Sequence, residues 1–92
     1  KILGEMEQNV KIEQSMSFAE VLYKAGSNKG LNMRRVAQAP FFVLRGAAMP
    51  AVLVEMGFLT DKAEASLLAN PTYQKKLAES LADGIESYLR NM

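Results

Sequence analysis

A nearly continuous apolar run at residues 51–56, AVLVEM, constrains the fold of this chain more than any other feature. Such a run is typical of a β-strand covered on both faces, as in a parallel or mixed sheet that lies between helices. Gly57 follows the run and is predicted to end it. We therefore expect a buried strand in the middle of the chain.

A second, shorter strand is predicted at residues 41–44, FFVL, which are aromatic and β-branched and follow Pro40. Residues 46–50 form the predicted turn between the two strands. Two strands alone make a marginal sheet. The sequence therefore predicts that further strands of the same sheet are encoded before Lys1 or come from another copy of the chain.

Helices are predicted before the strands. Apolar residues recur at helical spacing from residue 2 onward, but the apolar stripe moves to another face after Ile12. This change predicts two helices, or one sharply broken near residues 9–13. Gly26 is predicted to cap the C-terminal end of the second helix.

Two more helices are predicted after the strands. Asp61, with Glu64 three residues later, predicts a short helix that runs through Leu68. Asn70 suits an N-cap and Pro71 the first helical position, so a helix of roughly 18 residues should follow. Its apolar stripe consists of Tyr73, Leu77, Leu81, Ile85 and Tyr88.

This order of elements, α-α-β-β-α-α, predicts an α/β fold class. The expected architecture is a partial three-layer arrangement, in which a mixed or parallel sheet is flanked by helices and the N-terminal strands are missing. Residues 1–92 would then form the C-terminal part of a single domain.

Composition excludes several classes of function. The formal net charge is +1, so no strong field points to nucleic acid or to anionic lipid. The chain has no cysteine and no histidine, which removes thiolate nucleophiles, imidazole bases and the commonest metal ligands. No apolar run approaches the ~20 residues of a membrane span. The first residues lack a signal-peptide pattern and an initiator methionine, so the chain is expected to begin inside a longer protein.

Glu55 is the residue that fits a core strand least well. A carboxylate in apolar surroundings carries a desolvation cost of a few kcal/mol unless it is paired. Ligands in open α/β sheets bind beyond the carboxyl ends of strands, which is where Glu55 is predicted to lie. Burial would raise its pKa and suit it to act as a general base. Exposure on an edge strand, or an ion pair with Arg45, explains Glu55 equally well.

Residues 35–45, RVAQAPFFVLR, and residues 49–60, MPAVLVEMGFLT, closely resemble the zinc-dependent N-acetylmuramoyl-L-alanine amidases. The resemblance covers nearly all of the chain and is most specific at residues 50–58, where a buried strand, a terminal carboxylate and a glycine turn are combined. It implies the C-terminal half of an amidase catalytic domain.

The resemblance implies a peptidoglycan hydrolase that cuts the amide bond between N-acetylmuramic acid and L-alanine. The glutamate that matches Glu55 is catalytic in this family, and here it would act as the general base on a zinc-bound water. The family holds zinc with two histidines and a glutamate that precede the part resembled here. No metal ligand is therefore assigned within this chain, and the 92 residues alone are expected to be inactive.

Two further residues are candidates for substrate binding. Arg45 ends the first predicted strand, where its guanidinium is expected to orient a carboxylate or carbonyl of the substrate, unless it pairs with Glu55 instead. Gln38 lies in the preceding loop, where its amide is suited to bind peptide or glycan, although loops favour such residues in any case.

Two other hypotheses compete with the enzyme. The first is a non-catalytic cell-wall peptide-binding or assembly module that lacks the metal site. The second is a strand-exchanged or edge-paired dimer, because truncated sheets associate through their edges. The resemblance alone places the protein in the cell envelope, either periplasmic or extracellular, with peptidoglycan as its partner.

Overall fold

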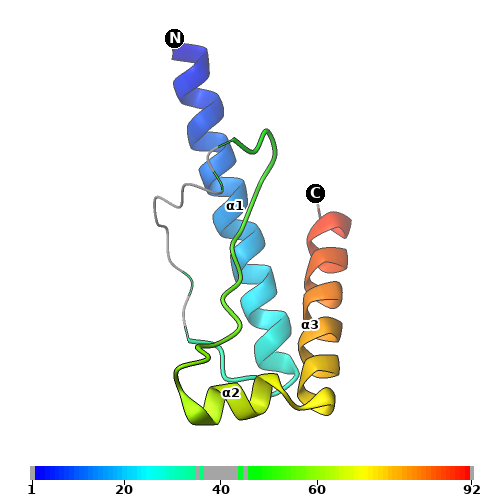
Figure 1. Cartoon of the computed structure of the whole chain (residues 1–92). Helices are drawn as coiled ribbons and strands as arrows, with labels where there is room; N and C mark the ends of the chain where they lie inside the picture. The colour runs from blue at the N-terminus through cyan, green and yellow to red at the C-terminus, as the bar shows by residue number, and fades with distance from the viewer. Residues whose placement is uncertain (1, 35, 37–43, 45, 92) are drawn as a thin grey trace.

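The computed structural model describes residues 2–34, 36, 44 and 46–91, with side chains from residue 10 onward. It contains the helices α1 (Ile2–Asn28), α2 (Lys62–Leu68) and α3 (Pro71–Arg90). Helices α1 and α3 lie side by side and run in opposite directions, and α2 lies across the end where α1 finishes and α3 begins (Figure 1). The described part of the connection to α2, residues 46–61, runs along α1 toward this end.

The predicted α/β fold is wrong, since the described residues form three helices and no strand. Residues 51–56, predicted as a buried strand, have no regular secondary structure and belong to no sheet. A strand needs a neighbouring strand to receive its backbone hydrogen bonds, and an apolar run cannot supply one. The Ala51 N–H donates instead to the Ser15 hydroxyl at 2.9 Å. Of the other predicted strand, only Leu44 lies within the described residues, and it lies in a turn.

Helix α1 is continuous, so the predicted break near residues 9–13 is also wrong. None of these five residues is proline or glycine. A change in the apolar face alters which side of a helix is covered, but it does not break the backbone hydrogen bonds.

The C-terminal end of α1 is set by Gly30 and not by Gly26. Gly30 has φ 77°, and its N–H donates to Ser27 O at 3.0 Å, while the Leu31 N–H donates to Gly26 O at 3.0 Å. This pair of bonds is a Schellman motif. Gly26 lies inside the last turn, where an added Cβ would stand 2.5 Å from Met33 Sδ. Its lack of a side chain therefore admits Met33.

The predicted starts of α2 and α3 are confirmed. Asp61 Oδ1 accepts from the Glu64 N–H at 3.0 Å. Asn70 Oδ1 accepts from the N–H groups of Thr72 and Tyr73, at 2.8 and 3.2 Å, and Pro71 occupies the first turn. Both signals act within four residues of chain, so they do not depend on the tertiary fold.

A thin interface between α1 and α3 forms the core. Leu22 and Leu31 are the buried apolar side chains among the described residues, and Ser80 and Gly84 are the buried positions of α3. The rings of Phe18 and Tyr88 stack across the same interface, with centroids 4.6 Å apart. Ile85, predicted within the apolar stripe, is 44% exposed. The small residues Ser80 and Gly84 lie beside the predicted stripe and allow α1 to approach closely. The buried face of α3 is therefore centred on these two residues and not on Ile85.

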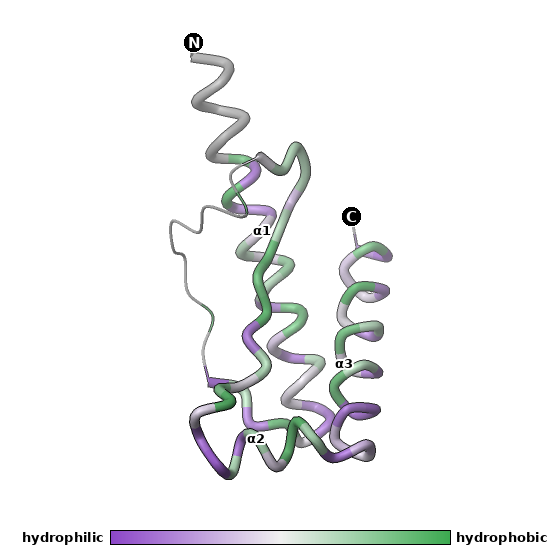
Figure 2. The backbone as a smooth tube through the Cα atoms, in the orientation of Figure 1, coloured by the Kyte–Doolittle hydropathy of each residue, from purple (hydrophilic) through white to green (hydrophobic). Residues whose placement is uncertain are grey.

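Much apolar surface is left uncovered. The chain exposes 7256 Å², whereas a compact monomer of its mass is expected to expose about 5,300 Å². Figure 2 shows that the connection running along α1 is largely hydrophobic. Within the described ranges, no helix combines the length and the apolar character needed to cross a membrane.

Candidate active site

The candidate site is built on residues 51–58, called here the Glu55 segment. This segment follows the turn at residues 46–50 and leads into α2. Lys11 of α1 donates through Nζ to the Ala47 carbonyl at 2.8 Å and to the Leu44 carbonyl at 3.4 Å. Together with the bond from the Ala51 N–H to Ser15, these contacts attach the start of the segment to α1.

Glu55 is exposed, which agrees with the solvent-facing interpretation of this residue and not with the buried one. Leu53, Val54 and Met56 are 46%, 39% and 55% exposed, which explains why they do not shield the carboxylate. No hydrogen bond or ion pair of Glu55 joins it to another described residue. The side chain is therefore open to water and to a polymer approaching from solvent.

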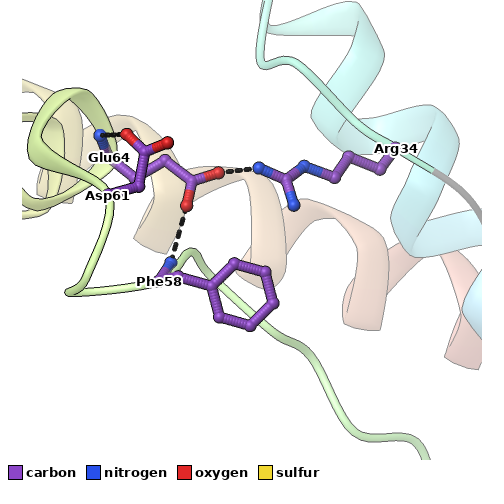
Figure 3. Close-up of polar contacts among 4 residues, drawn as sticks. All are labelled: Arg34, Phe58, Asp61 and Glu64. Atoms are coloured by element: carbon purple, nitrogen blue, oxygen red, sulfur yellow. Dashed lines mark hydrogen bonds and ion pairs between the residues drawn. The ribbon is translucent and has the colours of Figure 1, made fainter.

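The end of the Glu55 segment is held by a second carboxylate, that of Glu64. Its Oε2 accepts from the Phe58 N–H at 2.8 Å, and its Oε1 forms an ion pair with Nη2 of Arg34 (Figure 3). The Arg34 guanidinium carbon also lies 5.5 Å from the centroid of the Phe58 ring. We call these three residues the Arg34–Glu64–Phe58 cluster.

This cluster joins three separate parts of the chain: the loop after α1, the Glu55 segment and the first turn of α2. The Arg34 side chain is 61% exposed, so its ion pair contributes only about 0–1 kcal/mol to stability. A cation–π contact at an exposed site adds about 0.5–1 kcal/mol. These two contacts therefore add little to the stability of the fold.

Gly57 lies between Glu55 and Phe58 and has an unusual backbone conformation. Its φ is 149°, a conformation that side-chain-bearing residues rarely adopt. A Cβ at this position would lie 3.3 Å from Leu68 Cδ1 and 3.5 Å from Glu64 Cβ. Glycine thus permits both the backbone conformation and the close approach to α2.

The described residues do not fit a zinc ion. No group of three or more acidic side chains, the only anionic ligands in this sequence, gathers within the described ranges. Glu13 is exposed on α1, and the side chains of Glu5 and Glu7 lie outside the described residues. We derive no step of chemistry through a metal.

The substrate-binding candidates Arg45 and Gln38 lie outside the described residues, as does the alternative ion pair between Arg45 and Glu55. The contacts of Ser15 and Arg34 were not predicted from the sequence, and Glu64 was predicted only as a helix-start residue. A glutamate at the third helical position did signal that its carboxylate turns back toward the preceding chain. The distant partner Arg34 had no such local signal.

Comparison with known proteins identifies the family of this chain. A family model described as N-acetylmuramoyl-L-alanine amidase matches residues 5–87. The amidase AmiC of Neisseria meningitidis serogroup B is 35% identical over 88 residues, which are 95% of this chain and 21% of that protein. The amidase AmiA of Escherichia coli K12 is 33% identical over 89 residues, 96% of this chain and 31% of that protein. The amidase LytC of Bacillus subtilis is 40% identical over 67 residues, 73% of this chain and 14% of that protein.

The chain thus spans between 14% and 31% of the length of these three curated relatives. No solved structure matches it significantly. The matched range includes Glu55, Ser15 and the whole Arg34–Glu64–Phe58 cluster. The family predicted by the resemblance is confirmed: this chain belongs to the N-acetylmuramoyl-L-alanine amidase family.

Proposed function

We propose that residues 1–92 form the C-terminal part of a single catalytic domain that hydrolyses peptidoglycan, at the amide bond between N-acetylmuramic acid and L-alanine. The family match over residues 5–87 carries this proposal. The large uncovered apolar surface supports it, because a segment such as 51–58 is suited to lie against further parts of a domain.

We assign Glu55 the role of general base. In amide hydrolysis, a water molecule attacks the carbonyl carbon, and the nitrogen leaves as an amine. Glu55 takes one proton from the attacking water as the new C–O bond forms. It then gives that proton to the departing nitrogen as the C–N bond breaks, so the carboxylate is regenerated. Its lack of a partner among the described residues leaves the carboxylate available to accept a proton.

The zinc ion that the family resemblance implies is assigned to ligands outside these 92 residues. Histidine is absent from the sequence, and the described carboxylates form no cluster. The chain alone is therefore proposed to be inactive. Arg45 and Gln38 remain proposed substrate-binding residues. The cell envelope, periplasmic or extracellular, is the proposed location, because peptidoglycan lies there.

A glutamine substitution tests the assignment of Glu55. Glu55→Gln in the complete domain should lower kcat for muropeptide cleavage by about 100- to 10,000-fold, because glutamine cannot accept the proton. Glu79→Gln is the matched control, since Glu79 is also exposed but lies on α3. Near-normal cleavage by Glu55→Gln would show that another group is the base.

A second candidate function is a non-catalytic module that binds cell-wall peptides or assembles with other proteins. The absence of a ligand cluster among the described side chains favours it for the 92 residues taken alone. Titration with muropeptide, followed by amide chemical shifts, separates the two candidates. Saturable shifts localised around residues 51–58 in a chain without hydrolytic activity would favour the module.

A further inference from the structure

We infer that Glu64 is a positioning residue for Glu55, acting through the backbone of Phe58 and held in place by Arg34. The inference rests on the proposed function, because it concerns how the proposed base is oriented. It goes beyond that function in assigning a role to residues that do not touch the reacting atoms.

The connection from Glu64 to Glu55 is short and direct. Glu64 Oε2 accepts from the Phe58 N–H at 2.8 Å, and only Met56 and Gly57 separate Phe58 from Glu55. Gly57 has φ 149° and, as a glycine, has no side chain to restrain its backbone. The bond from the Phe58 N–H to Glu64 supplies a restraint at the next residue.

The Glu64 carboxylate is itself fixed on its other side. Its Oε1 pairs with Arg34, whose guanidinium also lies over the Phe58 ring, 5.5 Å from the centroid. The Glu64 side chain is only 18% exposed, whereas that of Arg34 is 61% exposed. Arg34 thus covers the Glu64 carboxylate on its solvent side. Arg34 also contacts Phe58, whose N–H donates to that carboxylate (Figure 3).

Helix capping alone does not account for this arrangement. In a capping box, the carboxylate at the third helical position accepts from the N–H of the N-cap residue. Here the N-cap is Asp61, and its N–H donates to Phe58 O at 3.1 Å. The Glu64 carboxylate reaches past Asp61 to the Phe58 N–H. The Glu64 carboxylate therefore holds Phe58, the residue after Gly57, rather than the N-cap of the helix.

The opposite end of the Glu55 segment is fixed by the bond from Ala51 to Ser15 on α1. Glu55 therefore lies between two anchors, one on α1 and one on α2. The Glu55 side chain makes no hydrogen bond or ion pair with another described residue, so its position depends on the backbone between these anchors.

The test uses variants of Glu64 and Arg34 in the complete domain, with two readouts. Glu64→Ala removes the acceptor, Glu64→Gln keeps an acceptor oxygen without the charge, and Arg34→Gln removes the cation but leaves Glu64. Glu86→Gln is the matched control, because it breaks another Arg–Glu pair, with Arg90 on α3, far along the chain from Glu55. The readouts are kcat and KM for muropeptide cleavage, and the hydrogen exchange of the Phe58 amide.

We expect Glu64→Ala to lower kcat by about 10- to 100-fold, because a small misplacement of a catalytic group has effects of this size. KM should stay within about threefold, because an orienting residue acts on the transition state rather than on binding. The Phe58 amide should exchange at least about tenfold faster, in line with loss of its acceptor. Glu64→Gln should restore most of both properties, and Glu86→Gln should change neither.

Two results would overturn the inference: unchanged kcat in Glu64→Ala, or a Phe58 amide that exchanges equally fast in both proteins. If Glu55→Gln abolishes cleavage while Glu64→Ala leaves kcat unchanged, only the positioning role fails. If Glu55→Gln retains cleavage, the proposed base fails, whatever Glu64 does. Exchange of the Ala65 amide in α2 checks that the helix remains folded in each variant.

Discussion

Gly84 of α3 lies directly against Leu22 of α1. A Cβ at position 84 would stand 2.5 Å from Leu22 Cδ2 and 3.2 Å from Leu22 Cα. Leu22 is 6% exposed, so it has little space into which to withdraw. The separation of the two long helices is therefore set at this pair of residues.

Gly84→Ala should destabilise the protein, although alanine is the better helix former. Helix propensity favours alanine by about 1 kcal/mol. Overpacking against Leu22 should cost about 1–3 kcal/mol and outweigh that gain. Chemical denaturation measures the net change. The double-mutant cycle with Leu22→Ala is the control: the cost should shrink in that background, and an unchanged cost would show that Leu22 is not the obstacle.

Gly57→Ala should lower the free energy of unfolding by about 1–3 kcal/mol, because its φ of 149° is unfavourable for alanine. Gly46→Ala is the control, since Gly46 is exposed and has nothing within 4 Å of an added Cβ. Thermal unfolding of both variants provides the comparison. Equal stability of the two would contradict a requirement for glycine at position 57.

Ser15→Ala should release the start of the Glu55 segment from α1. It removes the oxygen that accepts from the Ala51 N–H at 2.9 Å, with an expected loss of about 0.5–1.5 kcal/mol. Hydrogen exchange should show the Ala51 amide becoming faster. Ser17→Ala, at an exposed position on the same helix, should leave that amide unchanged. Unaltered exchange in Ser15→Ala would mean that the bond does not hold the segment.

Local signals in the sequence predicted the helix starts correctly. The Asp61 and Asn70 side chains bond to N–H groups within three residues, so the chain folds there as its immediate neighbours dictate. The family was likewise readable from residues 49–60, and the match over residues 5–87 confirms it.

Features that depend on distant partners were not predictable in the same way. The apolar run at 51–56 indicated a strand, but a strand requires a neighbour that the described chain does not provide. Glu55 is exposed because no neighbouring strand among the described residues covers its segment. Arg34 meets Glu64 across 30 positions of sequence, and neither residue type specifies such a pairing. The roles of Glu55, Arg45 and Gln38 stay predictions.

The 92-residue chain should self-associate when it is produced alone. Many large apolar residues are exposed, and three of them lie close together in sequence near α2: Met56, Phe58 and Leu59 are 55%, 50% and 79% exposed. Exposed apolar surface favours burial against another molecule. This association does not require the strand edges that were expected from the sequence. Sedimentation velocity over a range of concentrations should therefore show a rising average mass.

Leu59→Lys should weaken this association, because a charge at the centre of an apolar contact is costly to bury. Leu89→Lys is the matched control, since Leu89 is 60% exposed but lies in the last turn of α3. A mass independent of concentration would contradict the prediction, and equal weakening by both variants would place the contact elsewhere. In the complete domain the same residues should be covered, so Leu59→Lys should there reduce stability rather than association.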